Sequence, residues 1–183
     1  MSTEWQPKTN GKLKTYQIEI QGRIVVKGTT VLNLPYDTVC NFFSDPGYSR
    51  HITNILDSID ILYEESKWDR KLKVVQMVMK FAGPIANREF LLAHTIKHEH
   101  ENKVYMGSRS CLNYPYEQHK GTIMAMVYSS GFILERLTDG KTKMTMISDY
   151  DSRGNIPNFI KRWVAGKSVN FLKNVEEKIK KVN

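Results

Sequence analysis

Residues 141–182 read KTKMTMISDYDSRGNIPNFIKRWVAGKSVNFLKNVEEKIKKV, and their hydrophobic pattern changes period midway. Over residues 141–150, small or apolar side chains alternate with charged ones, which is typical of a β-strand with one buried face. From residue 156 the apolar side chains recur three or four positions apart, which predicts one long amphipathic helix. Its apolar residues are Ile156, Phe159, Ile160, Trp163, Val164, Phe171, Leu172, Val175, Ile179 and Val182.

The chain before residue 141 is dominated by predicted strands. A first hairpin is expected over residues 13–32, and Pro35 opens a short helical pattern that ends at the turn signal of residues 44–47. Later strands are expected at 59–64, 72–81, 89–97, 104–112 and 122–137. Because no helices separate these strands, they form a large antiparallel sheet. The sequence therefore predicts an α+β fold, in which a curved antiparallel sheet is closed by the long C-terminal helix.

Length and composition are those of one globular domain. We expect residues 1–10 to be a loose lead-in and residues 11–183 to form a single domain. No apolar stretch approaches the ~20 residues of a membrane span, and the N-terminus lacks the apolar core of a signal peptide. We therefore expect a cytoplasmic monomer. Its formal net charge of +8 favours anionic surfaces, but charge alone does not choose between nucleic acid and membrane.

Six methionines occur as pairs two residues apart on the predicted strands. Residues at i and i+2 point to the same face of a sheet, so each pair shares a face. These methionines either fill gaps in an ordinary core, or form a flexible wall that suits acyl chains. The predicted inward faces include the pairs Met77 and Met79, Met124 and Met126, Met144 and Met146, and continue from Met126 to Tyr128 and Ser130.

The segment KFAGPIANREF, residues 80–90, resembles a segment of the START domain family that ends in Asn-Arg-Asp-Phe/Tyr. Residues 107–110, 120–132, 142–145 and 151–157 are similar to further START segments and occur in the family's order, followed by the final helix. The resemblance extends over roughly residues 11–182. It implies a helix-grip fold that binds one lipid in a tunnel between the sheet and the C-terminal helix. Residues 82–87, residues 112–120 and that helix are then candidates for the lid.

The resemblance is greatest to the phosphatidylcholine-transferring members of the family, and it implies roles for individual residues. The three positions of their choline-binding aromatic cage correspond to Met77, Phe90 and Tyr128. Their phosphate-holding arginine corresponds to Arg50, although the Trp-Asp that follows it in the family is missing here. A polar partner of the phosphate corresponds to Ser130, and the cavity arginine of sterol-type members to His94.

Alternative interpretations stay open for several of these residues. Phe90 and Tyr128 are also compatible with plain core aromatics, and His94 with a hydrogen-bonded core histidine. Arg88 and Glu89 favour a structural ion pair. The complete set of predicted lipid-binding residues is Arg50, Met77, Met79, Phe90, Leu92, His94, Met124, Met126, Tyr128, Ser130, Met144, Met146 and Trp163.

The predicted function is to bind a single lipid and carry it between membranes, with a phosphatidylcholine-like phospholipid as the first choice and a sterol as the alternative. Transient, peripheral contact with an anionic membrane is expected through the lysine-rich face of the C-terminal helix. No nucleophile motif or Gly-rich phosphate loop occurs, so we expect no enzymatic activity and no cofactor, although related helix-grip proteins include cyclases and hydrolases. The run His98-Glu99-His100 lacks a third metal ligand, so no metal is expected. Aromatic residues alternate inward with methionine, which disfavours nucleic-acid binding.

Overall fold

A single ten-stranded sheet dominates the computed structural model, in which nine strands pair antiparallel and the short β8 pairs parallel with β6. The structure describes residues 6–9, 13–81, 85–154 and 158–182, with only the backbone described for 6–9, 52 and 158–165. The strand order is β1-β2-β3-β10-β9-β7-β6-β5-β4. The strands are β1 (Gln6–Thr9), β2 (Lys14–Ile20), β3 (Arg23–Leu32), β4 (Leu56–Lys67), β5 (Arg70–Met79), β6 (Arg88–His100), β7 (Lys103–Ser110), β8 (Ile123–Met124), β9 (Met126–Arg136) and β10 (Thr142–Asp151).

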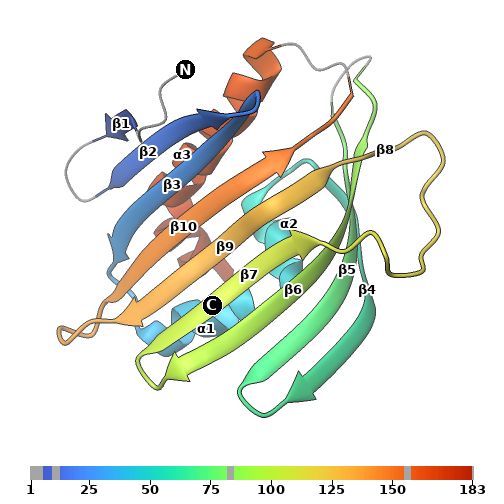
Figure 1. Cartoon of the computed structure of the whole chain (residues 1–183). Helices are drawn as coiled ribbons and strands as arrows, with labels where there is room; N and C mark the ends of the chain where they lie inside the picture. Colours follow the sequence, from blue (N-terminus) through green and yellow to red (C-terminus); the bar gives the residue numbers. More distant parts are fainter. Residues whose placement is uncertain (1–5, 10–12, 82–84, 155–157, 183) are drawn as a thin grey trace.

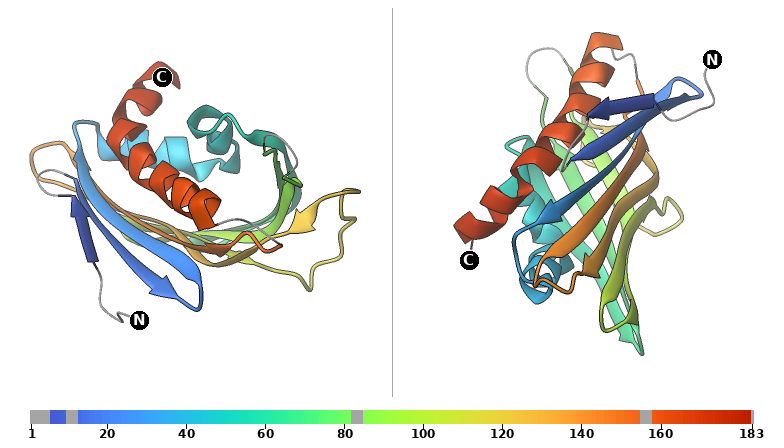
Figure 2. Two further views of the ribbon diagram at one scale, coloured as in Figure 1. Left: turned by 90° about the horizontal axis from the view of Figure 1, so that it is seen from above. Right: turned by 90° about the vertical axis from the view of Figure 1, so that its left-hand side faces the viewer.

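The C-terminal helix α3 (Asn158–Val182) crosses the concave face of this curved sheet (Figures 1 and 2). Leu172, Val175 and Ile179 recur at helical spacing and are all buried in the main core cluster. They pack with residues of β3 and β10, so the apolar stripe of the helix faces the sheet as the sequence predicts. The predicted helix-grip fold is confirmed. The start of the predicted helix, residues 156–157, lies outside the described residues.

Three short helical elements fill one end of the concave face between β3 and β4. They are α1 (Tyr36–Ser44), the 3-10 turn η1 (Pro46–Tyr48) and α2 (Ser49–Ile52). Phe43 of α1 is fully buried, and its ring centroid lies 4.4 Å from that of Phe132 on β9. Tyr48 packs against the same two rings at 5.0 and 6.0 Å. This aromatic cluster closes that end of the concave face.

The N-terminal segment differs in part from the predicted loose lead-in. Residues 6–9 form β1, an edge strand that pairs antiparallel with β2 in a register shifted between Pro7 and Thr9. The remainder of that lead-in, residues 1–5 and 10, lies outside the described residues. Pairing with β2 provides hydrogen-bond partners for the backbone N–H and C=O groups of β1, because an isolated extended segment cannot bond to itself.

A β-bulge in β9 changes which residues of this strand face inward. Along β10, Asp149 pairs with Ser129 but Tyr150 pairs with Val127, so Tyr128 is an extra residue without a partner. A bulge of this kind shifts the alternation of side chains by one position. Val127 is consequently buried, whereas Tyr128 is 41% exposed. The predicted continuous phase from Met124 to Ser130 is therefore wrong on the N-terminal side of the bulge.

Gly131 allows β9 to approach β7 closely. Its φ is +153°, and a Cβ added there would lie 2.9 Å from the Cα of Gly107 and against the carbonyl of Met106. These obstacles are backbone atoms, which cannot swing aside as a flexible side chain can. A larger residue at position 131 would therefore force the two strands apart.

We expect Gly131→Ala to destabilise the protein by about 2–4 kcal/mol, because it adds backbone strain and a steric clash. Gly107→Ala is a matched control, because Gly107 is the β7 partner of Gly131 and a Cβ there would meet nothing within 4 Å. Its stability should stay within about 1 kcal/mol of the parent. Urea unfolding measures both changes, and equal effects would contradict the close approach of the strands.

Candidate functional site

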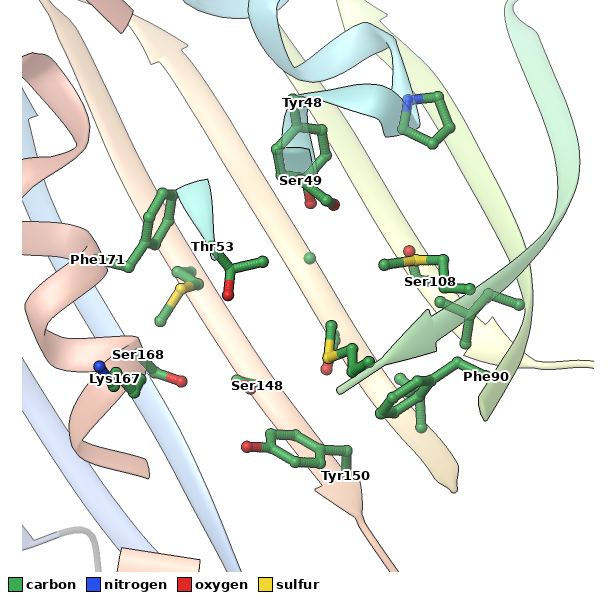
Figure 3. A pocket seen from close by; sticks show the side chains of 18 of the residues that line it. Tyr48, Ser49, Thr53, Phe90, Ser108, Ser148, Tyr150, Lys167, Ser168 and Phe171 are labelled. Carbon is green, nitrogen blue, oxygen red and sulfur yellow. The ribbon is translucent and has the colours of Figure 1, made fainter. Parts of the chain in front are cut away.

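A cavity of about 610 Å³ lies between the concave face of the sheet, the segment around α2, and α3 (Figure 3). Its wall is mostly apolar, with a few hydroxyl and amide groups contributed from several elements. An apolar cavity with a few converging polar groups is the usual form of a small-molecule binding site.

No helix in the described part of the chain is long and apolar enough to cross a membrane.

The structure brings seven of the predicted residues together around this cavity. Alternation along β5 and β6 directs them inward, and the register pairs Met77 with Phe90 across the two strands. One residue from β9 and one from β10 complete the group. The seven are Met77, Met79, Phe90, Leu92, His94, Ser130 and Met146.

The prediction that Tyr128, Met126 and Met124 face the cavity is wrong. Tyr128 lies on the outer face of the sheet, where the guanidinium of Arg23 stacks 3.9 Å from its ring centroid. The β9 bulge places Val127 on the cavity wall in place of Met126. Met124 belongs to β8, which pairs with the start of β6 and does not reach the cavity.

Met144 and Arg50 also lie away from the cavity. Met144 is fully buried, but α1 and the second half of α3 fill the space above it, so it is part of the core. Arg50 is exposed on α2, and its guanidinium donates a hydrogen bond of 3.4 Å to the carbonyl of Ile59. Trp163 lies on α3, but its side chain is outside the described residues.

Several cavity residues were missed by the sequence analysis. Tyr48, Ser49 and Thr53 come from the α1–β4 connection, whose short helices carry no signal for a ligand. Tyr150 was not among the predicted lipid-binding residues, but it points inward as the alternation along β10 from Met146 and Ser148 predicts, and burial raises the pKa of its hydroxyl. A signal existed for Ser168, which interrupts the apolar stripe of the helix between Val164 and Phe171. Figure 3 shows Ser168, Lys167 and Phe171 on the side of α3 that borders the cavity.

His94 is the buried polar residue of the cavity wall whose hydrogen bonding is incomplete. Its Nδ1 lies 2.9 Å from the hydroxyl of Ser108, while its Nε2 has no partner among the described residues. Burial, and secondarily the charge of Lys73, lowers the pKa of His94 to about 4. The imidazole is therefore neutral at pH 7 and offers one donor and one acceptor. The alternative of a fully hydrogen-bonded core histidine does not hold.

Arg88 and Glu89 do not form the predicted ion pair, because consecutive residues of a strand point to opposite faces. The guanidinium of Arg88 donates to the carbonyls of Ala86, Ser152 (2.6 Å) and Arg153 (3.1 Å). Its burial lowers its pKa. Arg88 thus ties the start of β6 to the segment that leads into α3.

Glu89 fastens the long β7–β8 connection to the sheet. Its fully buried carboxylate accepts hydrogen bonds from the side chains of Gln76 (2.6 Å) and Thr122 (2.6 Å) and from the backbone N–H of His119 (3.0 Å). Burial alone would raise the pKa of Glu89, but these hydrogen bonds outweigh it and lower the pKa. The carboxylate is therefore a structural anchor for the segment that the START resemblance identified as a lid candidate.

No cluster of three His, Cys, Asp or Glu side chains with metal-binding geometry occurs among the described residues. His98, Glu99 and His100 are exposed at the end of β6, and Glu99 is paired with Lys103 at 2.9 Å. Cys40 and Cys111 are free and partly buried, and burial raises the pKa of both thiols. These groups do not form a recognisable reactive site.

The lowered pKa of His94 makes a prediction about stability. Between pH 6.5 and about 4 the unfolded chain binds a proton at His94 that the folded protein does not, so stability falls as the pH drops through this window. His94→Gln should remove up to about 3 kcal/mol of that pH-dependent loss. Chemical unfolding at several pH values measures it, with His98→Gln, on the exposed end of β6, as the control that should keep the parent's slope. Identical slopes for the parent and His94→Gln would contradict the buried, neutral imidazole.

Comparisons with known proteins agree with this architecture. The START domain family matches residues 55–181, while curated protein sequences gave no match. Human StAR-related lipid transfer protein 5 has a TM-score of 0.81 at 16% identity, over 100% of this chain and 89% of that chain. The STAR-related lipid transfer protein from Xanthomonas axonopodis has a TM-score of 0.73 at 15% identity, over 96% and 98%. Human STARD10 has a TM-score of 0.73 at 13% identity, over 99% and 73%. The solved structures share the fold, and because the family match extends over more than half of the chain, the protein belongs to the START domain family.

Proposed function

We propose that this START domain binds a single lipid in its cavity and carries it between membranes. The observation that carries the proposal is the mostly apolar cavity between α3 and the concave face of the sheet. Removing acyl or ring carbons from water contributes about 0.8 kcal/mol per methylene, but a bilayer offers nearly the same gain. Selection of the ligand therefore depends on the few polar and aromatic groups of the wall.

The first candidate ligand is a sterol, or another compact lipid with a single hydrogen-bonding group. A buried polar atom left without a partner costs about 1–3 kcal/mol, and the Nε2 of His94 is such an atom on the cavity wall. A ligand hydroxyl at this point would restore the missing hydrogen bond. The volume of about 610 Å³ also falls within the range of about 300–1,000 Å³ that is usual for one compact ligand.

A phosphatidylcholine-like phospholipid is the second candidate, because aromatic side chains still surround part of the cavity. Tyr128 lies on the outer face and is not available to a choline group, but Tyr150 packs against the cluster of Met77 and Phe90. Two rings thus remain for cation–π contact with a quaternary ammonium group. Lys167 of α3 also borders the cavity and carries a charge that suits a phosphate.

Delivery of the lipid requires contact with a membrane and an opening of the cavity. The basic residues of α3 favour an anionic surface, and Lys173, Lys180 and Lys181 are exposed on it. The side chains of Lys161 and Arg162 lie outside the described residues. Arg88 ties the sheet to the segment before α3, and Glu89 ties it to the β7–β8 connection. Movement of either segment as a lid would break these hydrogen bonds.

Met77→Glu should abolish lipid uptake, because it places a charge on the cavity wall, whereas Met126→Glu should leave uptake intact. Transfer of a fluorescent lipid between vesicles and native mass spectrometry of the purified protein measure the two variants. Thermal unfolding shows whether each is folded. Equal loss in both variants would contradict the inward phase of β5, and an absence of bound lipid in the parent protein would contradict the proposed function.

His94→Phe should weaken sterol binding by about three- to tenfold, because it removes one neutral hydrogen bond while keeping a ring of similar shape. Tyr128→Ala, on the outer face, should leave binding unchanged. Competition of cholesterol and phosphatidylcholine against a fluorescent ligand measures the preference. Displacement by phosphatidylcholine alone, together with weaker binding in Tyr150→Leu, would reverse the order of the two candidates.

A further inference from the structure

The tip of the β4–β5 hairpin carries a tryptophan that contributes nothing to the core. Trp68 is 96% exposed, whereas the next most exposed large hydrophobic residue, Ile61, is 47% exposed. The indole makes no stacking or cation–π contact with any described residue. The folded domain therefore gains no burial free energy from this indole.

The backbone at this tip is also unfavourable for a tryptophan. Lys67 pairs with Arg70, so Trp68 and Asp69 form a two-residue turn, and φ at Trp68 is +57°. The first position of a two-residue hairpin turn with positive φ normally holds glycine, because a side chain there is strained. A bulky residue that is both strained and solvent-exposed points to a role outside the folding of the domain.

Basic side chains surround Trp68. Lys67, Arg70 and Lys71 flank it in the hairpin, and Lys97 of β6 lies opposite Arg70 in the register. The backbone N–H of His98 donates to the carbonyl of Asp69 at 3.3 Å, which holds the β6–β7 hairpin beside the tip.

The nearby acidic groups neutralise only part of this charge. Glu64 is engaged with Lys73 at 3.3 Å, and Glu99 with Lys103 at 2.9 Å. Within the described part of the chain, Lys67, Lys71 and Lys97 make no ion pair. Asp69 in the turn lies 3.9 Å from the guanidinium of Arg70, so the tip presents a fully exposed indole beside these three lysines.

We propose that the Trp68 tip, defined as Lys67–Lys71 with Lys97, is a docking site for the surface of an anionic membrane. Tryptophan is favoured at the membrane–water interface, where its apolar ring and its N–H are both accommodated. Each basic residue near an anionic surface strengthens binding by about fivefold. The combination of one indole and several cations fits this surface better than it fits a neutral one.

The Trp68 tip lies at the end of the sheet away from the start of β6 and from the N-terminal end of α3 (Figure 1). No residue of the tip lines the cavity. The site is therefore an anchoring contact that does not depend on which lipid the cavity holds, and it belongs to other elements than the basic face of α3. Loss of this contact would lower the residence of the protein on a membrane while leaving lipid uptake intact.

Co-sedimentation of the full chain with vesicles tests the proposal, with phosphatidylcholine alone compared with phosphatidylcholine plus phosphatidylserine. Trp68→Gly should weaken binding to the anionic vesicles by about fivefold or more, yet preserve or raise stability because glycine suits the φ of +57°. Lys67→Gln with Lys71→Gln should weaken binding similarly and reduce its dependence on salt. Lipid uptake in solution should stay at the parental level in all of these variants.

Matched controls come from another hairpin of the sheet. Ile20→Ala changes a 39% exposed apolar residue beside the β2–β3 turn, and Lys27→Gln removes an exposed cation from β3; neither should affect vesicle binding. In a protein whose only tryptophan is Trp68, after Trp5→Phe and Trp163→Phe, anionic vesicles should shift the fluorescence to the blue. Parental vesicle binding by Trp68→Gly, or an unshifted Trp68 spectrum on sedimenting vesicles, would overturn the proposal.

Discussion

The close approach of α3 to β3 determines where the cavity of this protein lies. Gly28 has no side chain, and a Cβ there would collide with the end of the Leu172 side chain. The helix can therefore rest directly on β3, where Leu172, Val175 and Ile179 complete the main core with Leu32. The helix reaches only this side of a strongly curved sheet. The space that it leaves between itself and β5, β6 and β9 becomes the cavity, so a single tight contact on one side makes an open interior possible on the other.

The buried polar residues fall into two groups that their hydrogen bonds distinguish. The polar atoms of Arg88 and Glu89 bond to carbonyls, one hydroxyl, an amide and a backbone N–H, so these two residues hold connections in place. His94 retains an unpartnered nitrogen on a cavity wall. In an apolar interior an unmade hydrogen bond is costly, and it persists where a ligand can complete it. Arg88 and Glu89 therefore support the cavity, whereas His94 is suited to contact a ligand, although all three side chains are buried.

The exposed residues show a similar division between structure and interaction. On the outer face of the sheet, Arg23 contacts two neighbours. Its guanidinium lies 3.9 Å from the ring centroid of Tyr128 and forms an ion pair of 2.9 Å with Asp149. Trp68 makes no ring or cation–π contact with the residues that the structure describes, and it sits on a strained turn. An exposed indole is suited to the membrane–water interface, which accommodates both its apolar ring and its N–H.

The sequence by itself determined the class of fold and much of one cavity wall. The change of period after residue 150 predicted the helix, and alternation along β5 placed Met77 and Met79 inward correctly, whereas Phe90 was assigned from the START resemblance. Tertiary structure decided the fate of Tyr128, because a single extra residue in the pairing of β9 with β10 reverses every side chain beyond it. It also decided two of the three carbonyl partners of Arg88, which lie 64 and 65 residues away along the chain. Periodicity is a local property that a sequence displays directly, whereas register and buried hydrogen bonds depend on which distant segments meet, and only the folded chain brings those segments together.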